Sequence, residues 1–182
     1  MMEQHTDAMV APPAGFSLKW FFNTSAALLS HPRLFFLKLA DSDIQWRRPA
    51  AFFIFTALLF SGASLLATHP VSAVSATAIF FINAVGMALF AFLVGYIIVK
   101  AGLGRPDALP RLFGVYAFSC GITLLLAWVP FSAWFTEPWK WWLIFTGLTR
   151  ACGFRAWEAL LVVAISIAVI VLFFSSLIAA VA

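Results

Sequence analysis

Three long stretches of the chain carry no charged side chain. Asp, Glu, Lys and Arg are absent from residues 49–99, 112–136 and 159–182, where apolar side chains dominate. A charge in hydrocarbon costs several kcal/mol, and every backbone polar group there must be paired within its own segment. Long uncharged apolar runs are therefore expected to cross lipid as helices. The pattern predicts an all-α, polytopic transmembrane helical bundle.

Charged and helix-breaking residues divide these stretches into five predicted spans. Arg48 and Pro49 precede the first span, His69 and Pro70 separate it from the second, and Pro130 lies near the end of the third. Proline removes a backbone donor and kinks or ends a helix. The expected spans cover residues 50–68, 72–99, 112–133, 138–150 and 158–180.

The fourth span is the shortest of the five. Only residues 141–149 are uncharged between Lys140 and Arg150, and so short a helix covers about half of a hydrocarbon core. The segment crosses if Lys140 snorkels to the interface and the helix begins near Pro138. A re-entrant or interfacial element is the alternative.

The segment before the first span is more polar than the rest. Residues 1–15 are expected to form a flexible polar tail, followed by an amphipathic segment at 16–48 and the transmembrane domain at 49–182. The amphipathic segment is too polar to span and too aromatic to stay in water. It predicts two short interfacial helices broken around His31 and Pro32. A soluble arm that docks on a partner is the alternative.

The basic residues predict the orientation in the membrane. Ten of the eleven lie before the first span, between the second and third, or between the fourth and fifth, and only Lys140 falls on the other side. Basic flanks are retained in the cytoplasm. We therefore expect a cytoplasmic N-terminus and an outer C-terminus. Without the fourth span, Arg150 and Arg155 would lie on the wrong side.

Composition supports a membrane protein and narrows its function. Hydrophobic residues make up 64% of the chain and charged residues 10%, with a mean hydropathy of +1.02. A soluble domain has about 25% charged residues. A bundle of 182 residues leaves no room for a separate catalytic domain. The net charge of +4 follows from the topology, so no nucleic-acid partner is expected.

Prolines, aromatics and glycines punctuate the chain in a recognisable order. The residues are Pro32, Phe35 and Phe36, Arg48-Pro49, Leu112-Phe113, Tyr116, Pro130, Trp139 to Trp142, Gly147-Leu148-x-Arg150 and Arg155-Ala156-Trp157. In this order the chain resembles bacterial Yip1-domain proteins over most of residues 30–175. The resemblance implies a five-helix integral membrane protein of a bacterial inner membrane, with a cytoplasmic N-terminus.

Eukaryotic relatives in that family are linked to small GTPases and vesicle traffic. Many of them carry an Asp-Leu-Tyr-Gly-Pro segment before the first span. The corresponding residues 41–49 read Asp-Ser-Asp-Ile-Gln-Trp-Arg-Arg-Pro here. This departure argues against carrying a GTPase-binding role over to this chain.

Few side chains within the spans suit chemistry. The four longer spans have no ionisable residue in their interior, which argues against a proton-coupled pump or an intramembrane protease. Asn83, midway along the second span, is expected to form an interhelical hydrogen bond, with a substrate contact as the alternative. Small residues on the same helix favour close packing, either within the chain or in an oligomer: Ala84, Ala88, Ala91 and Gly95.

Other candidates have stronger structural than functional explanations. Cys120 and Cys152 are expected to be free thiols, with metal binding, catalysis or acylation as minor alternatives. His69 is expected to be a turn residue rather than a metal ligand. Asp41 and Asp43 suit a solvated loop better than a cation site. No cofactor is predicted.

Two groups of surface residues are candidates for contact with lipid or a partner. An aromatic belt at the outer surface, or a site for a lipid, quinone or protein, is expected of Trp134, Trp139, Trp141 and Trp142. Contact with anionic headgroups on the cytoplasmic side is expected of Arg47, Arg48, Arg150 and Arg155.

The sequence favours a non-enzymatic membrane scaffold or adaptor of Yip1-like type. Aromatic and small-residue surfaces are abundant, and no catalytic cluster is evident. We expect the chain to be a subunit of a larger membrane assembly or a homo-oligomer. A small channel, permease component or lipid transporter is the alternative. An enzyme acting on lipid through His31, Asp41 and Asp43 has the least support.

Overall fold

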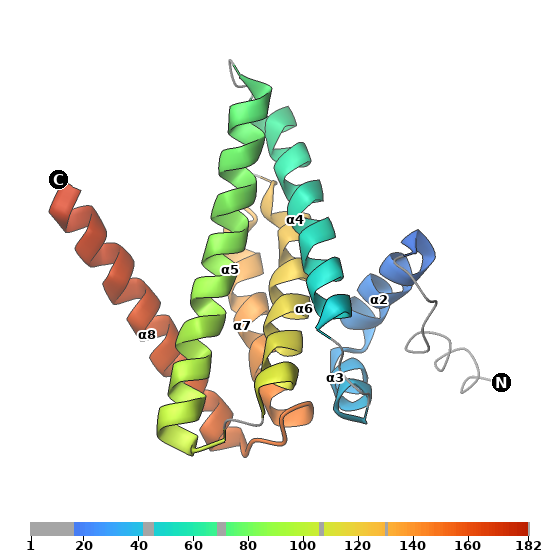
Figure 1. Ribbon diagram of the computed structural model, residues 1–182, viewed down its shortest axis with the longest axis vertical. Coiled ribbons are helices and arrows are strands. Elements are labelled where there is room, and N and C mark those ends of the chain that lie inside the picture. Colours follow the sequence, from blue (N-terminus) through green and yellow to red (C-terminus); the bar gives the residue numbers. More distant parts are fainter. Residues whose placement is uncertain (1–16, 42–45, 69–71, 106–107, 130, 182) are drawn as a thin grey trace.

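The computed structural model describes residues 17–41, 46–68, 72–105, 108–129 and 131–181. These residues form seven helices and contain no strand (Figure 1). The helices are α2 (Leu18–Ser30), α3 (Pro32–Asp41), α4 (Arg47–Thr68), α5 (Ala73–Leu103), α6 (Leu109–Ala127), α7 (Ala133–Arg150) and α8 (Ala156–Val181). The predicted tail at 1–15 lies outside the described residues, as do Asp43, His69, Pro70 and Pro130.

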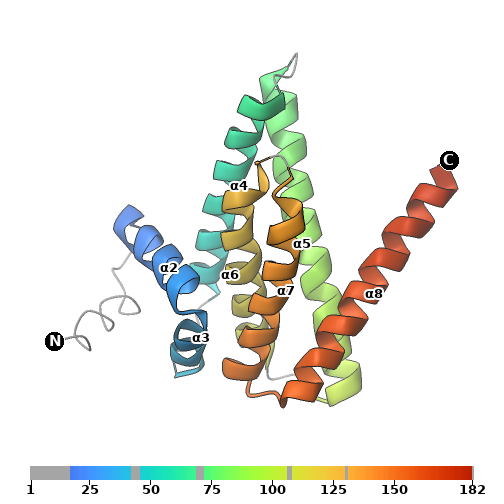
Figure 2. The ribbon, with the colours of Figure 1, turned by 180° about the vertical axis from the view of Figure 1, so that it is seen from behind.

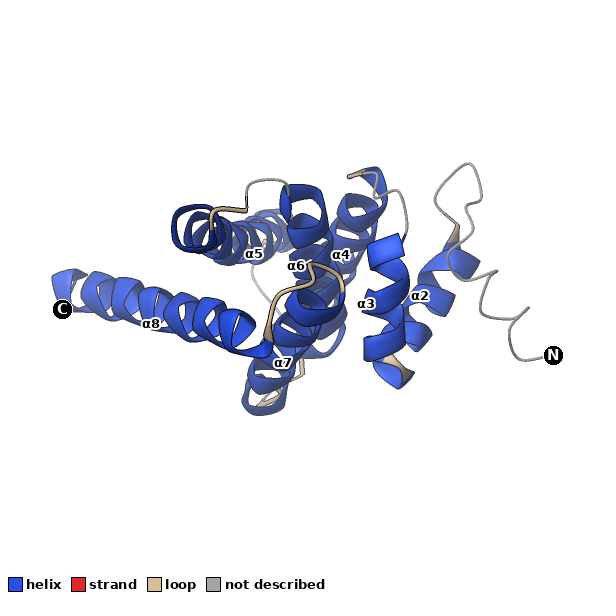
Figure 3. Ribbon diagram, turned by 90° about the horizontal axis from the view of Figure 1, so that it is seen from below, coloured by secondary structure: helices blue, strands red, loops and turns tan. Residues whose placement is uncertain are grey.

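Helix α6 is the centre of the bundle. It contacts α4, α5 and α7, and the view from below in Figure 3 shows these helices around it. In the apolar stretch of α6, 61% of residues are buried, against 22% in α5 and 17% in α8. Side chains of α4, α6 and α7 form much of the core, among them Phe52, Leu112, Tyr116, Leu143 and Leu148. The interior is therefore built around α6, while α5 and α8 keep most of their apolar surface uncovered.

The N-terminal helices break where expected. Helix α2 ends at Ser30 and α3 begins at Pro32, which confirms the predicted break around His31. The α2 ring of Phe21 lies 5.2 Å from Phe52 and 4.7 Å from Phe55 of α4, centroid to centroid. In α3, Phe35 packs edge-on against Phe118 of α6 at 5.0 Å. The pair thus docks through aromatic contacts on its own bundle.

A second face of α2 and α3 stays uncovered. Its large apolar side chains, each roughly half or more exposed, are Leu18, Phe22, Leu29, Leu34 and Leu37. An amphipathic segment is expected to have one apolar face. This pair of helices has two apolar faces, one packed against the bundle and one facing outward. Its placement in the membrane interface stays a prediction.

Four helices of the described chain are long and apolar enough to cross a membrane: α4, α5, α6 and α8. They match the first, second, third and fifth predicted spans. Helix α7 is present at the fourth position, but it does not have the apolar composition of the other four. The number of crossings therefore stays a prediction at this point.

Two span boundaries differ from the expectation by five residues or more. Helix α6 ends at Ala127 instead of 133, because proline at 130 disfavours a helical conformation in the preceding residue. The Trp128 indole Nε1 donates to the Leu125 carbonyl oxygen at 3.0 Å. This bond pairs one of the carbonyl groups in the last turn of the helix.

Helix α7 begins at Ala133, five residues before the expected start, so Pro138 lies inside it. The amides of Phe135 and Thr136 donate to the Ser132 carbonyl oxygen at 2.9 and 2.8 Å, which pairs donors of the first turn. The expectation that a proline marks the first turn of this helix was wrong.

Helix α8 diverges from the bundle. It begins beside the lower ends of α5 and α7 and slants away from them toward the C-terminus (Figures 1 and 2). At its base, Glu158 Oε1 lies 3.8 Å from Arg105 Nη2, in the connection that follows α5. Glu158 Oε2 accepts from the Arg155 backbone amide at 2.8 Å, a capping contact that pairs a free donor of the first turn. One buried carboxylate thus both starts α8 and ties it to the bundle.

We predict that Gly147→Ala destabilises the bundle. A Cβ added at Gly147 would lie 3.1 Å from Val115 Cβ and closer still to both of its γ carbons, so α6 and α7 would have to separate. Overpacking of this kind costs about 1–3 kcal/mol. Thermal unfolding in detergent measures the loss. The matched control is Gly86→Ala, where an added Cβ meets nothing within 4 Å, and equal melting of the two variants would contradict the prediction.

Candidate functional site

A groove of about 320 Å³ opens between α5, α6, α7 and α8, with one residue contributed by α4. It lies where α8 diverges from α7, and residues of α5 and α6 form the rest of its wall. Its lining is largely apolar and includes Phe60, Met87, Leu124, Ile167, Ile170 and Val171. The polar or charged residues in the lining are Asn83, Thr123, Thr136, Glu137 and Lys140. We call this cavity the α7–α8 groove.

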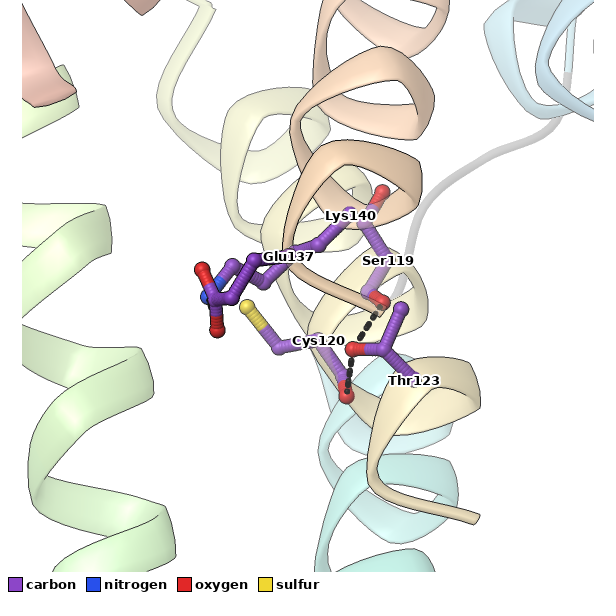
Figure 4. Close-up of polar contacts among 5 residues, drawn as sticks. All are labelled: Ser119, Cys120, Thr123, Glu137 and Lys140. Carbon is purple, nitrogen blue, oxygen red and sulfur yellow. Dashed lines mark hydrogen bonds and ion pairs between the residues drawn. The ribbon is translucent and has the colours of Figure 1, made fainter. Parts of the chain in front are cut away.

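An ion pair lies in the α7–α8 groove. Glu137 and Lys140 are one turn apart on α7, and Lys140 Nζ donates to Glu137 Oε1 at 2.7 Å (Figure 4). The Glu137 side chain is 57% exposed and that of Lys140 is 18% exposed. Lys140 Nζ also lies 5.4 Å from the ring centroid of Trp141, a favourable cation–π distance. The pair is electrically neutral as a whole, which lowers its cost next to apolar helices.

The α6 wall of the groove presents little polarity. The Thr123 hydroxyl donates within its own helix, to the Ser119 and Cys120 carbonyl oxygens at 3.2 and 3.0 Å. Cys120 is buried, and Figure 4 shows its sulfur on the side of α6 that faces the ion pair. The charged chemistry of the groove therefore comes from α7 alone.

The predicted residues of α5 fall into two groups. Asn83 is exposed and lines the groove together with Ala84, Ala88 and Ala91. The side-chain amide of Asn83 forms no hydrogen bond with the described residues. Gly95 lies elsewhere, because a Cβ at this position would meet the hydroxyl and ring of Tyr116 on α6. The small residues thus serve both a cavity and a close helix contact.

The four predicted tryptophans do not form one cluster. Trp134 is 82% exposed at the start of α7. Trp139 and Trp142 pack on each other with ring centroids 5.0 Å apart. Only Trp141 reaches the α7–α8 groove. The exposed aromatic surface also includes Phe131 and Phe135, at 85% and 81%, which the tryptophan pattern did not single out.

The predicted arginines lie at helix ends: Arg47 and Arg48 at the start of α4, Arg150 at the end of α7, and Arg155 before α8. Arg48 is half-buried, and the other three are exposed. Arg105, which was not among the predicted arginines, forms the ion pair with Glu158. Its guanidinium lies 5.3 Å from the Phe154 ring centroid. A second cavity of about 280 Å³ is lined by Gly104, Arg105, Ala108, Arg111 and Cys152.

Both cysteines are free thiols, with Cys120 buried and Cys152 partly buried. Cys152 lies in the connection between α7 and α8, where burial raises the pKa of its thiol to about 12 and the nearby Arg111 partly offsets the rise. A thiol with so high a pKa carries little thiolate near neutral pH.

The histidine and aspartate candidates are not brought together. His31 is exposed, with Nδ1 3.0 Å from the Ser30 hydroxyl, and Asp41 is exposed at the end of α3. Within the described ranges no group of three or more His, Cys, Asp and Glu residues is arranged to hold a metal. Asp43 and His69 fall outside those ranges.

The ion pair of the groove was not predicted, because Lys140 was expected to snorkel to the interface on its own. Their spacing of three residues was the available signal, since oppositely charged side chains at this spacing meet on one helix face. A helix that begins at Ala133 places both charges in its second turn, beside the neighbouring helices. The error in the helix start therefore concealed the site.

The length and composition of the helices define the class of the protein. Four apolar helices of membrane-spanning length, with charges confined to connections, helix ends and one neutral pair, identify an integral membrane protein of all-helical fold. The Yip1 domain model matches residues 26–178, so the chain belongs to the Yip1 domain family. No curated protein and no solved structure matches the chain.

We predict that Cys152 reacts slowly with maleimide in the folded protein. In a Cys120→Ala background, the single thiol should react about a thousandfold more slowly at pH 8 than in the denatured chain, because thiolate is scarce when the pKa is near 12. The folded-state rate should keep rising above pH 10, whereas the denatured rate levels off near pH 9. Equal folded and denatured rates at pH 8 would contradict the prediction.

Proposed function

We infer that the protein is a non-enzymatic membrane scaffold or adaptor, which holds other membrane proteins or a second copy of itself. The observation that carries this proposal is the uncovered surface of α8, where only 17% of the apolar stretch is buried. Its strongly exposed side chains include Leu160, Val171, Leu172 and Ile178. A helix that leaves its own bundle offers a whole face to a neighbouring helix.

The energetics of helix association in lipid support a protein partner for this surface. Apolar side chains gain little by leaving lipid for protein, so close packing provides much of the attraction between membrane helices. Helix α8 packs on α5 and α7 near its base, and Phe173 reaches Phe90 of α5 with ring centroids 4.9 Å apart. The remaining face of the helix is available for the same kind of packing against another chain.

The proposal includes five crossings, with the N-terminus in the cytoplasm and the C-terminus outside. Support comes from α7, whose 18 residues extend about 27 Å, close to a hydrocarbon thickness of about 30 Å. Helix α7 lies alongside α6 and returns the chain to the base of α8, where Arg105 meets Glu158. A chain that returns across the bundle needs α7 to run the depth of α6.

The lipid partners proposed for the cytoplasmic side are anionic headgroups. Arg47, Arg150 and Arg155 are exposed at helix ends, and Arg48 is half-buried next to Arg47. Each basic residue near an anionic surface contributes about 1 kcal/mol. These contacts orient the bundle and require no dedicated pocket.

A lipid transporter is the second candidate function. The α7–α8 groove favours it, because the cavity combines an apolar lining with the ion pair and the exposed amide of Asn83. Lipid headgroups and acyl chains require such a combination.

We predict that tags at residues 1 and 182 are accessible from opposite sides of the membrane. Five crossings place the two ends in different compartments, with residue 1 inside. Protease or membrane-impermeant labelling of sealed vesicles, before and after permeabilisation, measures the orientation. Both tags on one side would contradict the odd number of crossings, while leaving the membrane location intact.

We predict that purification from native membranes in mild detergent yields a stable complex or oligomer. Leu172→Trp, at a side chain 67% exposed on α8, should weaken that complex about tenfold through a clash with the partner. The matched control is Leu58→Trp, at a side chain 51% exposed on α4. Thermal unfolding should be unchanged in both variants. A lone monomer that transports a solute in liposomes would overturn the scaffold proposal.

A further inference from the structure

The α7–α8 groove contains two opposite charges in contact. Lys140 engages Glu137 through Oε1, and among the described residues no partner is found for Glu137 Oε2. An ammonium group has three donors, so Lys140 also retains capacity for a further acceptor. The groove therefore presents an acceptor carrying negative charge next to a donor carrying positive charge, at a mouth where the Glu137 side chain is 57% exposed.

We propose that this groove binds the headgroup of a zwitterionic phospholipid with a primary ammonium, of the phosphatidylethanolamine type. The ammonium of the lipid donates to Glu137 and its phosphate accepts from Lys140. Each contact is charge-assisted, which makes it stronger than a hydrogen bond between neutral groups. The dipole of the headgroup is thus placed antiparallel to that of the ion pair.

The size and lining of the groove fit this ligand. Its volume of about 320 Å³ is at the lower end of ligand pockets, which run from about 300 to 1,000 Å³. Ile167, Ile170 and Val171 of α8 and Met87 of α5 provide an apolar wall for the start of the acyl chains. The headgroup and the chains of one lipid thus find matching surfaces in one cavity.

The charges of the groove select among headgroups. An anionic lipid without an amine, such as phosphatidylglycerol, supplies a phosphate to Lys140 but has no cation for Glu137, which would repel it. A choline headgroup has no N–H to donate to Glu137, and quaternary ammonium groups are held instead by aromatic cages. Among the described residues that line the groove, the aromatic ones are Trp141 and Phe60, and Lys140 already lies over the Trp141 ring. A primary ammonium satisfies the site where choline does not.

A competition for retained lipid tests the proposal. The purified full chain is equilibrated in detergent with equal amounts of phosphatidylethanolamine, phosphatidylcholine and phosphatidylglycerol of identical acyl chains. Native mass spectrometry then counts each bound lipid. We expect phosphatidylethanolamine to be retained about tenfold over the other two, the effect of one charge-assisted hydrogen bond. Equal retention of the three lipids would overturn the proposal.

Two substitutions should change the lipid preference in different ways. Glu137→Gln leaves an uncompensated cation, so the preference should change from phosphatidylethanolamine to phosphatidylglycerol. Lys140→Gln removes the phosphate contact, so retention of both lipids should fall. Arg105→Gln alters the other ion pair, away from the groove, and should keep the original preference. An ion pair with a structural role alone would not reverse the order of lipids, so an unchanged order in Glu137→Gln would also overturn the proposal.

A steric pair of variants tests the cavity without altering its charges. Met87→Trp should fill the groove and reduce retention of phosphatidylethanolamine, whereas Leu93→Trp, on the same helix and outside the lining, should not. Equal retention in these two variants would place the lipid elsewhere. This inference is independent of the scaffold role, because the assay uses the isolated chain. Failure of lipid binding would remove support for the transporter candidate and leave partner co-purification unaffected.

Discussion

Three glycines let α6 touch each of its principal neighbours, and the bundle depends on these close contacts. Gly95 of α5 lies against Tyr116, and Gly147 of α7 lies against Val115. Gly121 of α6 itself lies against α4, where an added Cβ would come within 2.9 Å of the Phe52 ring. In lipid the hydrophobic effect does little to hold helices together, so contact distance decides how strongly they pack. Because glycine has no side chain, the large ring or branched side chain opposite it can lie directly against the backbone of the neighbouring helix.

This packing divides the molecule into a compact centre and an open periphery. Helices α4, α6 and α7, with α2 and α3 docked on them, account for most of the buried side chains. Helix α8 lacks an equivalent glycine contact in the described chain and is held at its base by Glu158 and higher up by ring contacts. The divergence of α8 creates the groove and exposes the face proposed for partners. The α7–α8 groove and the exposed face of α8 both occur where the close packing between helices ends.

Several features of the fold follow directly from the sequence. Uncharged runs locate the four apolar helices, because charge is excluded from hydrocarbon regardless of tertiary contacts. Pro32 locates the break between α2 and α3 for a similarly local reason. The docking of Phe21 on Phe52 and of Phe35 on Phe118 depends on residues far apart in the chain. Periodicity within one helix carries no information about such partners.

The α7 helix shows how one local error affects the interpretation of function. Proline at 138 was expected to start the helix, yet turn residues before Ala133 accept the first amides and move the start upstream. With that shift, Lys140 ceases to be a lone cation that must snorkel, because Glu137, three residues earlier on the same helix, neutralises it. Lys140 is the only basic residue on the predicted outer side, and its pairing with Glu137 lowers the cost of holding it beside apolar helices. Lys140, which departs from the expected cytoplasmic placement of basic residues, is therefore part of the ion pair that gives the groove its polar chemistry.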